Sequence, residues 1–260
     1  MGLFLKYMAI HLKAQLEYRT SLLLLLIGQL FVPLSVFAGV YFMFERFGSL
    51  QGWTFLEVAL CYAIMHMAYS LGEFIFRGFD TFSSLVVSGN FDRLLVRPRH
   101  SLIQVLGSKI DYSRIGRLLQ GVIIFIVVLY QLPIAFSLEK VLVLIFMIVG
   151  GIVIFGSIFI LQATLCFWTV QSLEVANIFT DGSRELVQYP LHIYEKWVRI
   201  FYTFVIPFGA VGYYPLLFLL DKQSVSLLAA LSLPWTALLF LMVSLLFWRF
   251  GVRYYRSTGS

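Results

Sequence analysis

Residues 21–44 read SLLLLLIGQLFVPLSVFAGVYFMF, a stretch without a single charged side chain. A helix of this length extends about 36 Å, which exceeds the ~30 Å hydrocarbon core of a bilayer. Pro33 is acceptable within it, because neighbouring helices can satisfy the backbone group that a proline leaves unpaired. The stretch therefore predicts a helix that spans a membrane.

The composition of the whole chain indicates the same class. Of its 260 residues, 60% are hydrophobic and 12% are charged, and the mean hydropathy is +0.90. A soluble domain of this size lacks the polar residues to cover so much apolar surface. We therefore expect an all-α, polytopic integral membrane protein that forms a single transmembrane domain over residues 1–260.

Four further apolar segments are long enough to cross the bilayer, at about residues 55–76, 118–137, 140–168 and 226–250. Before the first span, apolar residues recur at helical spacing with charged side chains beside them, namely Phe4, Leu5, Met8, Leu12 and Leu16. This pattern is typical of an amphipathic helix at the membrane interface, here over residues 1–20.

The remaining crossing has two possible positions. Hydropathy alone favours residues 200–220. The segment 171–188 is amphipathic instead, with one narrow polar face formed by Glu174, Asp181, Glu185 and Gln188, and with Asn177 beside it. Such a helix can lie on a membrane surface, or it can cross the membrane with its polar face toward a water-filled path. Either choice gives six transmembrane helices.

Charge gives the orientation. With six crossings, the first 20 residues, the segment 77–117 and the C-terminal tail share one side, and they hold 13 of the 19 basic residues but 4 of the 13 acidic ones. Because short basic loops stay in the cytoplasm, that side and both termini are predicted to be cytoplasmic. The net charge of +6 therefore follows from membrane orientation, and we expect no nucleic-acid partner.

Motifs of enzymes and metal sites are missing from the sequence. It contains no Gly-x-x-x-x-Gly-Lys-Ser/Thr phosphate loop, no His-Glu-x-x-His zinc motif and no Gly-x-Ser-x-Gly elbow. Cys61 and Cys166 fall in apolar segments and are expected to be packing residues. Glu57 and Glu73, at the two ends of the second span, are expected to bond to neighbouring groups, with a proton-relay role as the alternative. We predict no catalytic residue, metal ligand or cofactor in this chain.

The basic segment after the second span has a more specific pattern than a solvated run of charge. In DTFSSLVVSGNFDRLLVRP, residues 80–98, a short helix precedes Gly89 and a second amphipathic turn ends at Pro98. One side of that turn carries Phe91, Leu94 and Leu95, and the other carries Asp92, Arg93 and Arg97. Apolar side chains of this size are costly to leave in water. The turn is therefore expected to lie on the membrane or to dock into a groove of a partner.

The stretch GNFDRLLVRP, Gly89–Pro98, resembles the segment after the second span in membrane subunits of ATP-binding-cassette (ABC) transporters of the ABC-2 type. Two later stretches are similar to the same family, YPLHIYEKWVRIFYTFVIPFGAVGYYP at residues 189–215 and RYYRSTG at residues 253–259. The resemblance covers essentially the whole chain. It depends on the order of several motifs, because no single one is very specific.

The resemblance implies that residues 77–117 form a cytoplasmic loop with a coupling helix, which fits a cleft in a separate ATPase subunit. The residues carried over to this role are Gly89, Phe91, Asp92, Arg93, Leu94, Leu95, Arg97 and Pro98. Of these, the apolar side chains are expected to supply docking contacts, and the arginines to pair with acidic residues of the ATPase. The interfacial helix over residues 1–20 would touch the ATPase as well.

The resemblance also places the fifth span at 171–188, and an outer re-entrant region of short helices at 189–225, before the last span. A translocation path would then be lined by Glu174, Asn177, Asp181, Glu185 and Gln188. An outer gate would include Tyr189, Pro190, Pro207, Tyr214 and Pro215. The charges of Asp181, Arg184 and Glu185 depart from the family's pattern, and they leave the depth of this span open.

The function that the resemblance implies is the permease subunit of an ATP-driven exporter of a small amphipathic compound, peptide or lipid. Its partners would be two copies of an ABC ATPase, which bind ATP and magnesium, a second permease, identical or related, and the lipid bilayer of the cell membrane. This chain would not itself be an enzyme. Two alternatives are a secondary transporter or channel subunit, which should show internal repeats, and a lipid-modifying membrane enzyme.

Overall fold

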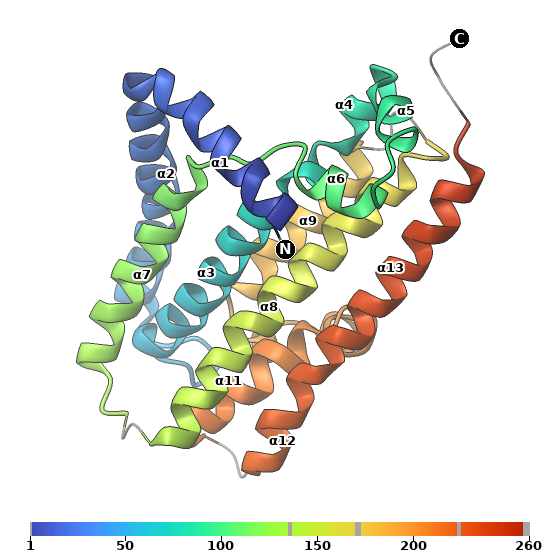
Figure 1. Cartoon of the computed structure of the whole chain (residues 1–260). Coiled ribbons are helices and arrows are strands. Elements are labelled where there is room, and N and C mark those ends of the chain that lie inside the picture. Colours follow the sequence, from blue (N-terminus) through green and yellow to red (C-terminus); the bar gives the residue numbers. More distant parts are fainter. Residues whose placement is uncertain (1, 135–136, 170–172, 223–224, 257–260) are drawn as a thin grey trace.

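The computed structural model describes residues 2–134, 137–169, 173–222 and 225–256, and of residues 173–179 it describes the backbone alone. It is 81% helical, and within those ranges it has no β-strand (Figure 1). The prediction of an all-α, polytopic membrane protein is confirmed.

Five helical segments among the described residues are long and apolar enough to cross a membrane. They are α2 (Arg19–Phe47), α3 (Phe55–Asp80) with α4 (Phe82–Val87), α7 (Arg114–Gln131), α8 (Leu138–Leu165), and α12 (Leu227–Ser232) with η4 (Leu233–Trp235) and α13 (Thr236–Tyr254). Each coincides with a span predicted from hydropathy. The preceding α1 (Gly2–Glu17) is a separate helix, as the apolar spacing predicts.

Helix α3 forms the centre of the bundle. It packs against both α7 and α8, and most of its residues are buried. Small side chains such as Ala59 and Ala63, both fully buried, let these neighbours approach. Helix α2 buries Pro33, Val40 and Phe44 alone. The rest of its apolar surface faces outward, as expected for a helix at the edge of a bundle in lipid.

A re-entrant hairpin, residues 194–222, follows α9 (Leu173–Val187) and η1 (Leu191–Ile193). It contains α10 (Lys196–Ile200), η2 (Phe201–Val205), η3 (Gly209–Tyr213) and α11 (Tyr214–Leu219), and its two arms are bent by 91°. Both ends lie at the turn between α2 and α3, where Gln51 Nε2 donates to Ile193 O at 3.5 Å and Lys222 Nζ donates to Gly52 O at 2.8 Å. The bend lies inside the bundle, where the Phe208 ring is 4.8 Å from that of Phe155 in α8. The hairpin therefore enters and leaves the bundle by the same end.

Pro207 accounts for the bend. Helical geometry is disfavoured for the residue before a proline, and Ile206 is extended, with φ −116° and ψ 106°. Residues 200–220 thus do not form the straight span that hydropathy alone favours, and the predicted re-entrant short helices are present before the last span.

Helix α9 follows α8 and runs antiparallel to α3. Arg184 lies over the Tyr69 ring at 5.3 Å, and the Val187 carbonyl accepts from Cys61 Sγ at 3.7 Å. The helix therefore lies alongside α3, but it is not among the described segments that are long and apolar enough to cross a membrane, and its assignment as the fifth span stays a prediction. Its 15 residues extend about 22 Å, which is less than the ~30 Å hydrocarbon core.

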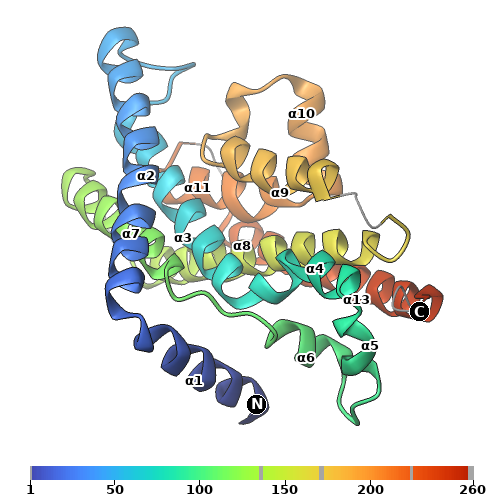
Figure 2. The same cartoon turned by 90° about the horizontal axis from the view of Figure 1, so that it is seen from above.

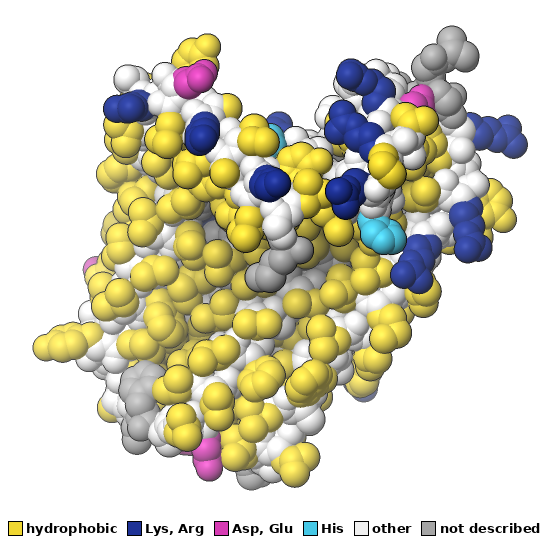
Figure 3. Space-filling model, in the orientation of Figure 1, with side chains coloured by type: hydrophobic (Ala, Val, Ile, Leu, Met, Phe, Trp, Pro, Cys, Tyr) yellow, Lys and Arg dark blue, Asp and Glu magenta, His cyan; other side chains and the backbone are white. Residues whose placement is uncertain are grey.

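One end of the bundle carries most of the positive charge. Helices α1, α4, α5 (Asn90–Leu95) and α6 (Ser101–Leu106) lie there with the end of α13 (Figure 1). Figure 3 shows lysine and arginine side chains gathered at that end, beside an apolar middle. We call it the basic end. The view in Figure 2 places α9 and α10 on one side of α3 and α8, and α1 and α6 on the other.

Replacing Gly116 by alanine should separate α2 from α7. A Cβ atom at this position would lie 2.2 Å from the carbonyl oxygen of Leu26, which cannot move without shifting α2. Overpacking of this kind costs about 1–3 kcal/mol, so the Tm of the purified protein in detergent should fall by several degrees. Gly28→Ala is the control, because nothing lies within 4 Å of a Cβ atom there, and it should leave the Tm unchanged or slightly higher. Equal Tm values for the two variants would contradict the close contact of α2 with α7.

Candidate functional site

A short helical hairpin, α4 and α5, stands at the basic end. Gly89 between the two helices has φ +66°, a left-handed conformation that is costly for residues with a Cβ atom. From α6, Gln104 Nε2 donates to both Leu94 O and Arg99 O at 2.9 Å. The predicted helix, glycine break and second turn are therefore present. Gln104, which is buried, is an anchor that the sequence pattern did not indicate.

An aromatic cluster fastens this hairpin to the spans. Its members come from α3, α4, α5, the chain after α8, α13 and the tail: Phe79, Phe82, Phe91, Phe167, Trp248 and Tyr255. Phe91 is fully buried, and its ring centroid lies 4.9 Å from that of Phe82 and 5.0 Å from that of Tyr255. Offset and edge-on ring pairs at such distances stabilise a fold beyond the area that they bury. The cluster therefore joins α5 to α3, α8 and α13.

The burial of Phe91 corrects one expectation. The spacing placed Phe91, Leu94 and Leu95 together on a face toward a partner, but Phe91 lies in the aromatic cluster and Leu94 packs against the core. Leu95 is 41% exposed and Val96 is 85% exposed. The outward surface of the hairpin consists of Arg93, Leu95, Val96, Arg97, Pro98 and Arg99, with Asp92 half-buried beside it. Periodicity shows which residues share a face, and here the chain itself covers most of that face.

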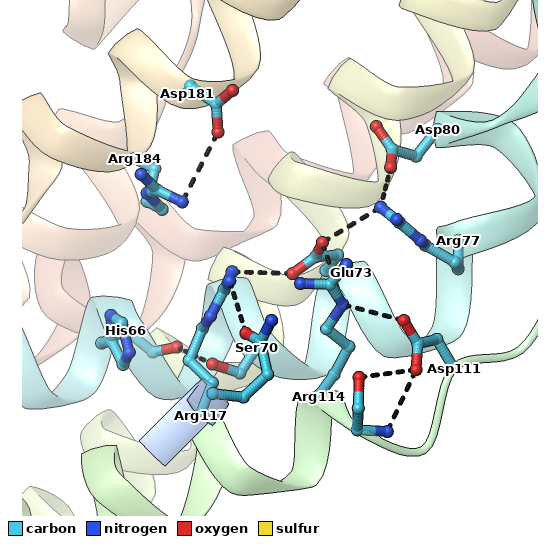
Figure 4. A network of polar contacts seen from close by, with 12 residues as sticks. His66, Ser70, Glu73, Arg77, Asp80, Asp111, Arg114, Arg117, Asp181 and Arg184 are labelled. Atoms are coloured by element: carbon cyan, nitrogen blue, oxygen red, sulfur yellow. Dashed lines mark hydrogen bonds and ion pairs between the residues drawn. The ribbon is translucent and has the colours of Figure 1, made fainter. Parts of the chain in front are cut away.

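A buried carboxylate is the centre of the polar network below the hairpin (Figure 4). Glu73 of α3 is 4% exposed. Its oxygens lie 2.8 Å from Arg117, 3.2 Å from Arg77 and 3.3 Å from Arg114, and Arg117 also donates to Gln29 Oε1 of α2 at 2.7 Å. An unpaired charge inside an apolar bundle is costly. The network therefore holds α2, α3 and α7 together, which agrees with the expectation that Glu73 bonds to its neighbours.

Two more carboxylates belong to this network. Asp80 pairs with Arg77, and Asp111 lies 3.3 Å from Arg114. Ser113 donates to Asp111 from its backbone nitrogen at 3.1 Å and from its hydroxyl at 2.6 Å. Partial burial by itself would raise the pKa of Asp111, but the hydrogen bonds from Ser113 and the charge of Arg114 hold that pKa below its ordinary value. Asp111 therefore stays ionised beside its arginine.

Helix α1 is held against the loop between α6 and α7. Gln15 Nε2 donates to Ile110 O at 2.7 Å, and Gln15 Oε1 accepts from Tyr112 N at 3.0 Å. A ring nitrogen of His11 lies 3.1 Å from Gly107 O. Because Asp111 belongs to the same loop, α1 is connected to the ionic network of Glu73.

The predicted path residues on α9 have different surroundings. The side chains of Glu174 and Asn177 lie outside the described residues. Those of Asp181 and Glu185 are 58% and 50% exposed, and they lie 3.5 Å and 2.6 Å from Arg184. Gln188 is 4% exposed, so it does not share the exposed face of Asp181 and Glu185.

The inner edge of this face borders a polar cavity of about 70 Å³ between α2, α3, α7 and α9. The polar side chains that line it are Tyr62, His66, Arg117, Arg184, Glu185 and Gln188. The His66 ring stacks on that of Tyr62 at 5.0 Å, and its ring nitrogens have no hydrogen-bond partner among the described residues. The volume suits about two water molecules at ~30 Å³ each. Part of the predicted path and the Glu73 network thus meet at one cavity.

The predicted gate residues are distributed along the hairpin and the chain before it. Tyr189 and Pro190 precede the hairpin and border a small cavity with Tyr213. Pro207 is buried at the bend, and Tyr214 and Pro215 begin α11. The structure therefore brings the first two residues close to η3, while Pro207 lies deeper in the bundle.

Two ion pairs at the opposite end of the bundle fix the second end of the hairpin. Lys140 Nζ at the start of α8 lies 2.6 Å from Asp221, and Lys222 Nζ lies 2.7 Å from Glu57. Glu57 and Thr54 also form a capping box at the start of α3. Glu57 therefore bonds to its neighbours as expected, but the partnership with Lys222 connects residues too far apart in sequence to be predicted.

The described residues form neither a metal site nor an exposed, reactive cysteine. No group of three or more His, Cys, Asp or Glu side chains among the described residues could hold a metal ion. Cys61 and Cys166 are free thiols, and both are buried.

Comparison with known proteins gives one family match. The model of a family described as ABC-2 family transporter protein matches residues 30–259. No curated protein and no solved structure matches the chain. The matched range begins within α2 and reaches the C-terminal tail, so it includes the α4–α5 hairpin, Glu73 with its three arginines, and α9.

Replacing Phe91 by alanine should loosen the α4–α5 hairpin. Removing a fully buried ring from a packed cluster costs about 3–5 kcal/mol. The Tm in detergent should fall, and trypsin should cut faster between Arg93 and Arg99. The matched control is Leu95→Ala, which removes a 41% exposed side chain of the same helix and should change stability by no more than about 0.5 kcal/mol. Equal effects of the two changes would contradict the assignment of Phe91 to the interior.

Replacing Glu73 by glutamine should destabilise the basic end. Three partly buried guanidinium groups would lose their shared counter-charge, and breaking a buried ion pair from one side costs up to about 3–5 kcal/mol. Glu45→Gln, a change at an exposed position of α2, should leave the Tm unchanged. Adding Arg117→Gln to Glu73→Gln should restore part of the lost stability, because Arg77 and Arg114 keep Asp80 and Asp111 as partners, whereas the ion pair of Arg117 is with Glu73. A further loss in the double variant would show that the charge balance is not what matters.

Proposed function

The chain belongs to the ABC-2 transporter family and is a permease subunit of an ABC transporter, and we propose that this transporter is an exporter driven by a separate ATPase subunit. Its cargo is a small amphipathic compound, a peptide or a lipid, and it crosses the cytoplasmic membrane. ATP and magnesium bind to the ATPase, of which two copies attach to the cytoplasmic face.

The construction of the α4–α5 hairpin is the observation that carries this proposal. Its outward surface presents Arg93, Arg97 and Arg99 around the apolar Leu95 and Val96, which suits a partner groove with an acidic rim. Its inward surface is anchored by Phe91 in the aromatic cluster. Because close-packed interiors transmit strain, a partner that displaces the outward surface also displaces α8 and α13. In this proposal the ATPase docks on the basic outward surface, and Phe91 transmits the movement of the hairpin to α8 and α13.

The basic end is the cytoplasmic end in this proposal. Helix α1, the α4–α6 segment and the end of α13 share that end (Figure 1), and short basic segments stay in the cytoplasm. The ends of the re-entrant hairpin then face outward. In this proposal the gate opens toward the exit side at Tyr189, Pro190, Tyr214 and Pro215, and Pro207 forms its inner end at the bend.

A second permease, identical or related, covers the charged face of α9. Asp181 and Glu185 are at least half exposed in the single chain, and charged side chains are costly where they meet lipid. A partner that encloses this face with water removes that cost. The path between the two permeases is then lined by Asp181 and Glu185, and the cavity at His66 opens from its edge. This arrangement favours a cargo with a polar or cationic part.

Reversing the charge of the outward surface tests the coupling. The triple change Arg93→Glu, Arg97→Glu and Arg99→Glu should leave the Tm within about 1 °C, because exposed substitutions change stability little. It should reduce co-purification with the cognate ATPase at least tenfold. The new glutamates would face the acidic rim of the ATPase groove, and like charges across an interface weaken binding. Arg46→Glu, an exposed change at the opposite end, is the control and should keep the complex intact.

Vesicles test the exporter itself. Membrane vesicles that hold the permease and its ATPase should transport cargo only when ATP is supplied on the ATPase side, and the triple variant should not. Nucleotide-dependent transport by vesicles that hold this chain alone would overturn the proposal. Normal transport by the triple variant would show that the hairpin is not the docking surface.

A further inference from the structure

A cavity of about 290 Å³ lies between α8, the re-entrant hairpin and α13. Its walls include Leu161 and Leu165 of α8, Phe201 and Val205 of the hairpin, and Phe240 and Phe247 of α13. It shares no lining residue with the polar cavity at His66. Because Leu165 is the last residue of α8, the cavity lies in the half of the bundle next to the basic end.

Water is a poor occupant of this cavity. The volume corresponds to about ten groups of the size of a water molecule or a methylene, at ~30 Å³ each. A buried water needs about two to four polar partners, but Gln162 supplies the single polar side chain among the lining residues. Apolar atoms, by contrast, would make dispersion contacts with every wall. The lining therefore favours a hydrocarbon chain over water as the occupant of the cavity.

The side toward the basic end shows where a polar group of the occupant would lie. The Trp168 ring stacks on Phe247 at 5.5 Å and on Phe250 at 5.9 Å, and the Phe250 ring lies 4.6 Å from that of Tyr254. Trp168 and Tyr254 are 45% and 58% exposed. Trp and Tyr side chains in membrane proteins favour the interface between hydrocarbon and headgroups. These rings therefore mark the depth at which the ester groups of a lipid lie.

Arg253, an exposed residue of α13, lies three residues after Phe250 and therefore on the same side of the helix as this aromatic rim, whereas Arg249 lies about 160° around the helix from Phe247. Guanidinium groups near the bilayer surface attract anionic headgroups. We propose that the cavity holds an acyl chain of an anionic phospholipid, whose phosphate lies toward Arg253. A chain in this position fills the space between η2 and α13 and supports the bend of the hairpin. The inference requires only that the protein spans a membrane, so its failure would leave the proposed transport function untouched.

Native mass spectrometry tests the inference. The full chain is reconstituted into vesicles of equal parts phosphatidylglycerol and phosphatidylcholine, extracted in mild detergent, and the retained lipids are counted. The wild type should keep one phosphatidylglycerol per chain. Leu161→Trp, which fills the cavity from α8, should reduce that retention at least tenfold. Leu246→Trp, the same change at a 57% exposed position of α13 outside the lining, should keep it.

Further variants separate the parts of the inference. Val205→Trp fills the cavity from the hairpin, at a 56% exposed position where a larger side chain should not disturb folding. It should reduce phosphatidylglycerol retention in the same way, and it replaces Leu161→Trp if that variant fails to fold. Arg253→Gln should lower the preference for phosphatidylglycerol over phosphatidylcholine about fivefold, whereas Arg249→Gln, on the other flank of α13, should leave it unchanged. Unchanged retention in folded Leu161→Trp and Val205→Trp proteins would overturn the site. Equal retention of the two lipids by the wild type would overturn the anionic headgroup.

Discussion

The carboxylate of Glu73 is the contact on which the basic end depends. Arg77, Arg114 and Arg117 bring their charges into a bundle that is otherwise apolar, and each lies within 3.3 Å of this one side chain. Charges in such surroundings are stable only when they are paired and hydrogen-bonded. The positions of α3 and α7 relative to each other are therefore fixed by charge as well as by packing. The loop before α7, and α1 upon it, take their places from the same network.

The surface of the basic end is joined to the spans by two connections of different kinds. The ionic connection runs from the loop at Asp111 through Arg114 to Glu73 on α3. Its directional hydrogen bonds and ion pairs fix the orientation of this loop relative to α3. The aromatic connection runs from Phe91 to Trp248 of α13 and to Phe167 after α8, and it depends on close packing. A force on the loop therefore reaches α3 and α7 by one connection, and α8 and α13 by the other. A permease whose energy comes from another subunit requires transmission of this kind.

Lipid imposes a second constraint on the structure. Helix α2, with apolar side chains around most of its surface, can face hydrocarbon, whereas the charged face of α9 needs water or protein. Backbone that leaves helical geometry must be enclosed as well. Pro207 is accordingly buried, with the bend of the hairpin between α8 and α13. Polar and irregular segments therefore lie at the centre, at the ends, or along the face proposed to meet a second permease.

The sequence by itself determined the features that depend on near neighbours along the chain. Runs of apolar residues specified the spans, Gly89 specified the break between α4 and α5, and Pro207 separates two short helices. These could be predicted because helix length, left-handed glycine and the restriction before proline are local properties. The tertiary structure alone decided what covers each face. Phe91 is packed by its own chain rather than by a partner, and Glu73 is paired with Arg117, 44 residues away. Periodicity cannot supply such facts, because it orders side chains around one helix axis, while burial and pairing depend on which helices come together.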